Sequence, residues 1–169
     1  MDALQALHTR RSIRRYRNEP VPDDLIQQLL SAAMMAPSAR NAQPWHFVVL
    51  TDPALLQAAA QINPNAWMTA QAPVAILVCA DLHLELSPGY WPVDCAAAVE
   101  NLLLAAHALG LGAVWTGIYP RQERIDGFRR LLSLPEAIMP HSLVPLGYPA
   151  EQPASHDRYR ADRVHRDRW

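Results

Sequence analysis

The residues best suited to chemistry form a cationic run near the start of the chain. Residues 10–17 hold five arginines beside Ser12 and Tyr16. Each guanidinium presents a rigid fork of N–H donors that can bind a phosphate through two hydrogen bonds. A solvated basic surface is the alternative interpretation of a run this short. The run therefore indicates an anion-binding site or a basic surface, and the rest of the sequence must decide between them.

A second distinctive stretch lies at residues 36–45, with the sequence Ala-Pro-Ser-Ala-Arg-Asn-Ala-Gln-Pro-Trp. It is rich in small and amide side chains, and it separates a helix-like apolar pattern from a strand-like one. We interpret Gln43, Pro44 and Trp45 as structural support for this loop. The stretch therefore predicts a connecting loop held in place by its own last residues.

The charge balance limits the classes of function. The chain has fifteen arginines and sixteen acidic residues, which gives a formal net charge of −1. This balance argues against a dedicated nucleic-acid or membrane-surface binder, so an arginine-rich nucleic-acid binder is only a remote alternative. The absence of lysine excludes a Schiff-base lysine and a P-loop lysine. Five arginines lie in residues 10–17 and five in residues 158–168, so we expect both ends of the chain to serve one anionic ligand.

Other catalytic chemistries find little support in the sequence. Cys79 and Cys95 lack CxxC or metal-ligand spacing, so we expect buried, reduced thiols. The seven histidines are scattered, and no metal site is expected. Ser12 and Ser38 have no recognisable His/Asp arrangement for nucleophilic catalysis. No GxGxxG motif is present, so a nicotinamide nucleotide would have to bind transiently.

Length and periodicity predict one domain built from helices and strands. Half of the 169 residues are apolar, enough for a sizeable core. The pattern predicts helices over 2–9, 23–36, 53–62, 92–109 and 125–132, and strands over 46–50, 74–79, 113–116 and 141–146. We expect the third strand to break at Gly117. No segment reaches the roughly twenty apolar residues of a membrane span and no apolar leader is seen, so we expect a cytoplasmic protein.

Two segments point to a second subunit. The predicted helix over 92–109 is apolar almost all round, and its alanines allow another helix to approach closely. Residues 150–169 form an arginine-rich tail with almost no core-forming side chain before Trp169. Such a tail cannot bury itself, so its terminal tryptophan indicates that it packs on something. In a domain this small, we expect the partner of the helix to include a second subunit.

Five motifs, in this order, resemble those of the nitroreductase family of FMN-dependent flavoproteins. They are Arg10-Arg11-Ser12-Ile13-Arg14, residues 36–45, residues 110–118, Leu146-Gly147-Tyr148-Pro149, and the closing Asp157-Arg158-Tyr159 with Val164-His165 and Trp169. The resemblance implies an α+β fold, with a mostly antiparallel central sheet flanked by helices, in an intertwined homodimer. It implies that residues 1–169 form a single FMN-binding domain whose tail, residues 150–169, packs on the partner subunit. The short, lysine-free chain is similar to the bacterial-type branch of the family.

The resemblance also implies a role for individual residues. Arg10 would pair the FMN phosphate, Arg11 and Ser12 would lie along the phosphate and ribityl chain, and Arg14 would approach the pyrimidine edge of the ring. The other cofactor-binding residues implied are Pro37, Ser38, Ala39 and Asn41 from the other subunit, Asn65 near the O2 edge, Trp115, Thr116, Gly117 and Ile118 near N5 and O4, and Arg158 as a second phosphate arginine. No side chain is expected to be catalytic, because flavin N5 would carry the chemistry while Arg14 and Gly117 tune it.

The activity implied is that of an NAD(P)H-dependent oxidoreductase. NADH or NADPH would deliver hydride to flavin N5 and leave, and a nitroaromatic, quinone or similar electron-poor acceptor would then take its place in a ping-pong cycle. Two alternatives stay open. One is a protein that binds or sequesters FMN without turnover, and the other is a flavin enzyme of the same fold with different chemistry, such as dehydrogenation or dehalogenation.

Overall fold

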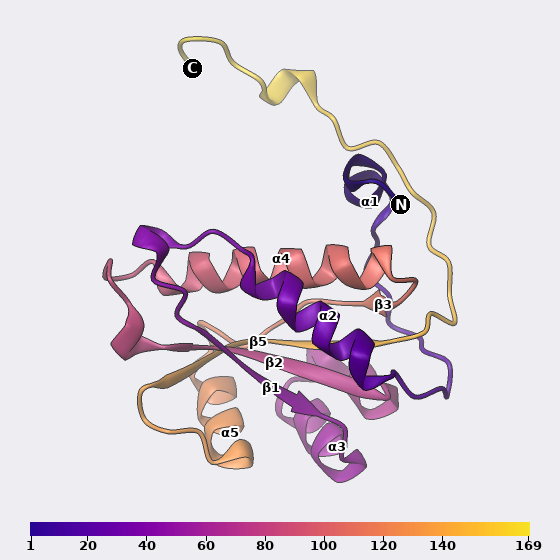
Figure 1. Ribbon diagram of the computed structural model, residues 1–169, viewed down its shortest axis with the longest axis vertical. Helices are drawn as coiled ribbons and strands as arrows, with labels where there is room; N and C mark the ends of the chain where they lie inside the picture. The colour runs from indigo at the N-terminus through magenta and orange to yellow at the C-terminus, as the bar shows by residue number, and fades with distance from the viewer.

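A computed structural model describes residues 1–169 and shows a central sheet between two layers of helices (Figure 1). The helices are α1 (Ala3–Thr9), α2 (Asp23–Met34), α3 (Pro53–Ile62), α4 (Trp91–Ala108) and α5 (Gln122–Leu132). The strands are β1 (Trp45–Leu50), β2 (Val74–Asp81), β3 (Gly112–Ala113), β4 (Thr116–Gly117) and β5 (Ile138–Gly147). Four short 3₁₀ helices complete the chain: η1 (Ala39–Asn41), η2 (Pro64–Gln71), η3 (Leu82–Leu84) and η4 (Ala161–Arg163).

Every strand pairing in the sheet is antiparallel. The strand order is β1-β2-β5-β3, and β4 also pairs with β5. Helices α2 and α4 cover one face, and α3 and α5 cover the other (Figure 1). The predicted α+β fold with an antiparallel central sheet and flanking helices is thus confirmed.

Strand β2 supplies the core on both faces of the sheet. Alternate side chains of a strand point to opposite faces, and Val74, Ile76 and Val78 pack in the cluster beneath α2 and α4. Ala75, Leu77 and Cys79 pack in the cluster against α3 and α5. The unbroken apolar run at 74–79 therefore forms the fully buried strand that the sequence predicts. Strand β1, by contrast, is an edge strand, and its middle residues are only partly buried.

Local sequence signals explain where the helices begin. The Asp2 carboxylate accepts a hydrogen bond from the Gln5 amide at the start of α1. Asp52 caps α3 in the same way, and Pro53 follows it at the first helical position, where a missing N–H costs nothing. Residues 63–72, which the pattern leaves without a regular element, contain the 3₁₀ helix η2.

The outer edge of β5 is covered by two short strands. Gly112 and Ala113 pair with Gly147 and Leu146, while Thr116 and Gly117 pair further along β5. The predicted single strand over 113–116 is therefore interrupted after Ala113, and its second part, β4, ends at Gly117, where the sequence predicts the break. The last strand is also longer than expected, since β5 runs from Ile138 to Gly147.

Helix α4 keeps an apolar surface that its own chain leaves uncovered. Leu102 and Leu103 are buried, but Val93 and Ala108 are exposed. The C-terminal half of α4 also borders a mostly apolar groove, whose other walls come from α1 and the end of α2. No helix of the protein combines the length and the apolar composition needed to span a bilayer.

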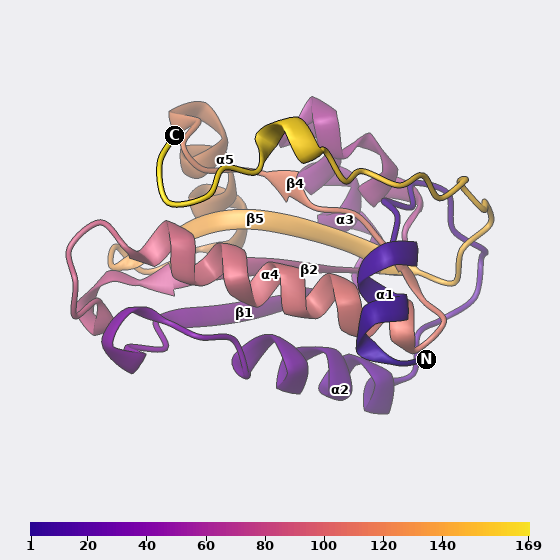
Figure 2. The same ribbon diagram turned by 90° about the horizontal axis from the view of Figure 1, so that it is seen from above.

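The tail leaves the body of the molecule (Figures 1 and 2). It passes α1 and then projects beyond it, and its hydrogen bonds after residue 156 stay within the tail. Trp169 stacks on His165 with ring centroids 4.3 Å apart, yet it is 101% exposed. The tail therefore buries none of its apolar side chains on its own chain.

Replacing Gly112 by alanine should destabilise the fold. A Cβ atom there would lie 2.6–2.8 Å from the side chain of Ile13, which is buried and cannot swing away. We expect Gly112→Ala to lower the free energy of unfolding by about 1–3 kcal/mol, as overpacking does, measured by urea denaturation. Gly117→Ala is the control, because its Cβ would meet nothing nearer than Tyr119 O at 3.9 Å. Equal stability of the two variants would contradict this packing.

Candidate functional site

The arginine-rich segment is pinned to the edge of the sheet beside β3. Ser12 forms a parallel bridge with Ala113, and the Ile13 amide donates to the Ala113 carbonyl at 3.0 Å. The Tyr16 hydroxyl lies 2.7 Å from the Ile13 carbonyl and 3.0 Å from that of Pro145. Burial raises the pKa of Tyr16, so this hydroxyl stays a donor. These contacts fix the main chain and leave the arginine side chains outside.

The start of the tail is fastened to the same segment. The Glu151 carboxylate accepts hydrogen bonds from the amides of Arg14, at 2.5 Å, and Arg15, at 3.2 Å. The Arg11 guanidinium donates to the Ala154 and His156 carbonyls, both at 3.3 Å. Two segments more than 130 residues apart in sequence therefore lie side by side.

Three of the arginines named in the sequence line one hollow. Arg10 and Arg11 form one wall, and Arg158 in the tail forms another, around a volume of about 200 Å³. Arg10 Nε lies 3.5 Å from Glu100 Oε1, and its terminal nitrogens have no hydrogen-bond partner in the chain. The structure therefore gathers both predicted phosphate arginines, Arg10 and Arg158, at one cationic hollow.

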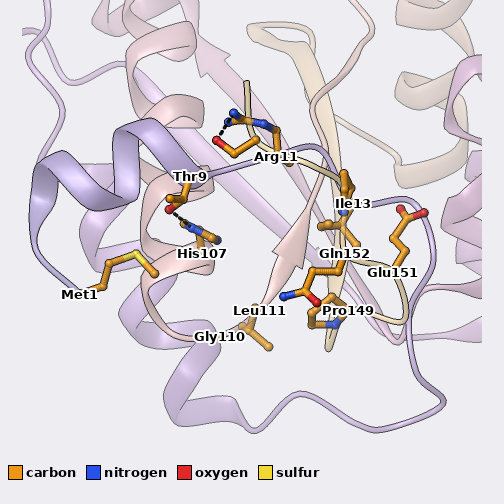
Figure 3. A pocket seen from close by; sticks show the side chains of 12 residues that line it. Met1, Thr9, Arg11, Ile13, His107, Gly110, Leu111, Pro149, Glu151 and Gln152 are labelled. Atoms are coloured by element: carbon orange, nitrogen blue, oxygen red, sulfur yellow. Dashed lines mark hydrogen bonds between the residues drawn. The ribbon is translucent and has the colours of Figure 1, made fainter. Parts of the chain in front are cut away.

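His107 lies beside this cationic cluster. Its pKa is lowered by partial burial and by the charges of Arg10 and Arg11. The Thr9 hydroxyl donates to the Gln5 carbonyl at 2.6 Å, so His107 Nε2 donates to Thr9 Oγ1, 2.7 Å away (Figure 3). His107 therefore links α1 to α4 as a neutral side chain.

A larger cavity of about 410 Å³ also has Arg11 in its lining (Figure 3). Its walls come from the end of α1, the end of α4 and the start of the tail, and they include Thr9, His107, Leu111, Pro149 and Gln152. Neither Arg10 nor Gly117 lines it. Of the residues that the sequence singles out for the cofactor, this cavity therefore has Arg11 alone in its lining.

A run of alternating exposure leads from β3 through β4. Trp115, Gly117 and Tyr119 are exposed, whereas Thr116 and Ile118 are buried. The Thr116 hydroxyl donates inward to the Leu143 carbonyl at 2.7 Å. The Ile118 amide donates to His141 O at 3.1 Å, so it is already paired. On the outer face of this run, Gly117 thus lies between the half-exposed side chains of Trp115 and Tyr119.

The Gly117 carbonyl is held by two donors that the sequence analysis did not identify. Asn63 is fully buried, and its Nδ2 donates to Gly117 O at 3.1 Å. Arg124 Nη1 donates to the same oxygen at 2.7 Å. Asn63 Oδ1 accepts from the amide of Asn65, which brings exposed Asn65 to the neighbourhood of Gly117. The only sequence signal for Asn63 is its place before Pro64 at a helix start.

An aromatic cluster lies beneath Gly117. The His141 ring lies 6.1 Å from that of Trp91 and 5.7 Å from that of Trp115, centroid to centroid, and Trp91 meets Tyr119 edge-on at 4.7 Å. His141 is only 7% exposed, and burial lowers its pKa to about 4 despite a hydrogen bond to the Pro92 backbone. His141 is therefore neutral at neutral pH, while the Arg124 guanidinium on the Gly117 carbonyl brings a positive charge to this end of the site.

The loop at residues 37–43 has an unusual backbone. Arg40, Asn41 and Gln43 have φ angles of 55°, 58° and 49°, a region that costs non-glycine residues energy. Hydrogen bonds compensate: the Gln43 amide donates to Ser38 Oγ at 2.9 Å, and its side chain donates to Asn41 Oδ1 at 3.1 Å. Gln43 thus supports the loop, as the sequence suggests.

This loop is tied to the start of α4. The Ala39 amide donates at 2.8 Å to Asp94, a carboxylate that is 4% exposed. Thr9, at the end of α1, meets α4 at His107, thirteen residues further on, which is about 20 Å along a helix. The two views agree that η1 and α1 lie at opposite ends of the molecule (Figures 1 and 2). One chain therefore does not bring residues 37–41 together with the arginine segment.

The two cysteines and the acidic residues provide no further site. Cys79 and Cys95 are free and buried. Burial raises the pKa of Cys79 to about 12 and also raises the pKa of Cys95, so both thiols stay protonated. The structure brings together no group of three His, Cys, Asp or Glu side chains that could hold a metal ion.

Comparison with known proteins places these features in context. The sequence model described as "Nitroreductase family" matches residues 7–85 and 63–148. A protein of Methanothermobacter thermautotrophicus, provisionally named an NADH dehydrogenase/NAD(P)H nitroreductase, is 51% identical over 169 residues, which cover 100% of this chain and 88% of that protein.

Solved structures are similar over the whole chain. A Bacteroides thetaiotaomicron protein with the same provisional name has a TM-score of 0.94 and 41% identity, over 99% of this chain and 98% of that one. A protein of Desulfovibrio desulfuricans, provisionally named a nitroreductase and solved in complex with FMN, has a TM-score of 0.84 and 34% identity, over 98% and 96% of the two chains.

His141 should make stability depend on pH. Its pKa is about 4 in the folded protein and 6.5 ordinarily, so between these values the unfolded chain binds a proton that the folded protein does not. This contribution is fully present above pH 6.5. We expect the free energy of unfolding to fall by up to about 3 kcal/mol as the pH is lowered towards 4, measured by urea denaturation. His141→Gln, which cannot titrate, should show a shallower decline, and an identical pH profile would exclude His141 as the cause.

Proposed function

The chain belongs to the nitroreductase family, and we propose on that basis that it is an FMN-dependent enzyme that oxidises NAD(P)H and reduces an electron-poor acceptor. The single observation that carries this proposal is the meeting of Arg10 with Arg158 at one hollow. These residues come from opposite ends of the chain, and a hollow between guanidiniums suits the phosphate of FMN.

The edge of the sheet suits the rest of the cofactor. Five residue steps from Gly112 to Gly117 span about 16 Å of extended chain, so an elongated ligand can reach from the arginines to the glycine. At Gly117 no side chain stands in the way, and the nearest atom to a built Cβ is 3.9 Å distant. Trp115 and Tyr119, 38% and 41% exposed, flank the glycine and suit a flat aromatic ring. The residues present therefore fit FMN.

Each chain residue in this site has a physical role. Arg10 and Arg158 hold the phosphate, and Ser12 lies along the ribityl chain. Arg14 keeps a cation at the ring, where it stabilises the negative charge that the ring gains on reduction. The Gly117 backbone borders the ring, and the clamp from Asn63 and Arg124 keeps that backbone in place.

The complete site needs a second copy of the chain. The loop that holds Pro37, Ser38, Ala39 and Asn41 is tied to Asp94 in the first turn of α4, whereas Arg10 lies beside Glu100 in the middle of that helix, so in a homodimer these loop residues would come from the partner subunit. The apolar outer surface of α4 and the exposed tail, residues 150–169, supply surfaces for such an interface. In this arrangement Trp169 becomes buried on the partner.

When bound, FMN supplies the two-electron chemistry, taking hydride from NADH or NADPH and passing it to a nitroaromatic, quinone or similar acceptor in a ping-pong cycle. The protein's own residues bind the flavin, orient it and shield it from solvent. His141 is neutral and buried, and burial raises the pKa of both thiols, so none of these three groups is suited to deliver a proton. Solvent therefore supplies it.

The absorbance spectrum of the purified protein tests this function. We expect a flavin band that bleaches when NADH or NADPH is added without oxygen, and that returns when a nitroaromatic or quinone follows. The nucleotide that bleaches faster identifies the donor. A flavin band that neither nucleotide bleaches would instead indicate a flavin-binding protein without this activity. Failure to bind added FMN would reject the proposal altogether.

Mixed dimers test whether the site is shared. Arg10→Ala and Ala39→Trp damage opposite halves of the proposed site, so each homodimer should lose FMN. In the mixed dimer one site carries both changes and the other carries neither, so half of the wild-type flavin content should return. Flavin titration of the separated mixed species measures this. No recovery, with both variants folded by circular dichroism, would show that one chain forms the whole site.

A further inference from the structure

We propose that Arg11 is a positioning residue: its guanidinium clasps the tail at residues 154–156 and so sets Arg158 opposite Arg10, where the two receive the FMN phosphate together. This inference rests on the proposed function. It assigns Arg11 to the protein's own tail, whereas the family resemblance places it along the phosphate and ribityl chain.

The contacts of Arg11 carry this assignment. Beyond the two tail carbonyls, its Nη2 donates to Ser155 Oγ at 2.5 Å, and its Nη1 donates to the carbonyls of His8, at 3.1 Å, and Arg10, at 2.6 Å. Ser155 Oγ donates in turn to the His8 carbonyl at 3.0 Å. Every nitrogen of the guanidinium is thus engaged with its own chain.

These acceptors are carbonyls and a hydroxyl, and none is a carboxylate. Arg11 therefore fastens the tail without losing its positive charge to an ion pair. The charge remains beside Arg10 and adds to the potential that attracts an anion. Its effect on the pKa of neighbouring His107 agrees with an unneutralised cation at this point.

The clasp acts at short range on Arg158. One residue separates His156 from Arg158, a span of at most about 7 Å between their Cα atoms, so fixing one confines the other. The Asp157 carboxylate accepts from the Tyr159 amide at 2.9 Å, which turns the chain at Arg158. Arg158 itself is exposed and has no partner in the chain, so nothing else holds it near Arg10.

Electrostatic repulsion makes a contact that holds Arg158 near Arg10 necessary. Arg10 and Arg158 carry like charges and repel each other before the anion arrives. A tail without buried apolar side chains has nothing to oppose that repulsion. The Glu151 carboxylate fixes the tail at one point, and Arg11 fixes it at a second, closer to Arg158.

Binding of FMN and of riboflavin, which lacks the phosphate, tests the inference. Arg158→Ala should weaken FMN binding roughly tenfold or more, since it removes a charge-assisted pair. Arg11→Ala should weaken FMN binding similarly and leave riboflavin binding unchanged. The double variant should lose clearly less FMN affinity than the sum of the two single losses, because Arg11 acts chiefly through Arg158 and its charge adds only a weaker long-range attraction. Arg160→Ala removes the same charge from the tail but leaves the clasp intact, since Arg160 pairs with Asp162, so its affinities should equal those of the wild type.

Three outcomes would overturn the inference alone. Additive losses in the double variant would mean that Arg11 contacts the phosphate directly. An equal loss of affinity for FMN and for riboflavin in Arg11→Ala would mean that Arg11 has a general structural role. Unchanged FMN affinity in Arg11→Ala would mean that the contacts of Arg11 with the tail do not affect FMN binding. Wild-type protein that binds neither flavin would instead refute the proposed function, and this inference with it.

NMR order parameters of the backbone without flavin give a readout that is independent of affinity. Arg11→Ala should lower the order parameters of residues 154–159 while leaving those of the sheet unchanged. Ser155→Ala, a milder change that removes only the bridging hydroxyl, should lower them in the same segment to a smaller extent. Unchanged order parameters in both variants would show that the tail is held by something else.

Discussion

The arginine-rich segment depends on uncharged contacts to stay where it is. Its guanidiniums repel one another and cannot be buried unpaired, so they cannot attach the segment to the protein. Ile13 attaches the segment instead, because its side chain packs directly on Gly112, where there is no room for a Cβ atom. The Tyr16 hydroxyl also contacts main-chain carbonyls of both the segment and β5. With the backbone fixed in this way, the cations of Arg10 and Arg14 are free to face a ligand.

The long helix α4 separates what the chemistry must bring together. The arginine segment lies near its C-terminal end, while the loop at 37–43 is bound to Asp94 in its first turn. That loop holds three non-glycine residues in left-handed backbone conformations, which costs free energy. Such strain in a connecting loop indicates that the loop has a function. A rigid helix cannot bend to close this gap, so the geometry favours a site completed by a second copy of the chain.

Charge and polarity are graded along the site. At one end lie guanidiniums and a tail held by neutral acceptors. At the other end, around Gly117, His141 is neutral, the Thr116 hydroxyl points inward and the Arg124 guanidinium is bonded to the Gly117 carbonyl. An elongated molecule with an anionic end and a flat aromatic end matches both regions, because each end then meets the environment that costs least to desolvate.

The sequence by itself determined most of the helices and strands and indicated a segment suited to binding an anion. The continuous apolar run at 74–79 requires a strand buried on both faces, Asp2 and Asp52 mark helix starts, and clustered arginines indicate an anion, because these signals depend only on neighbouring residues. Only the tertiary structure decided which distant residues meet. Nothing local in the sequence shows that Arg11 binds the tail, that Asn63 holds Gly117, that Asp94 holds Ala39, or that residues 113–116 form two strands. Those contacts depend on the register of β3, β4 and β5 and on the path of the tail, and a period of two or 3.6 residues carries no information about either.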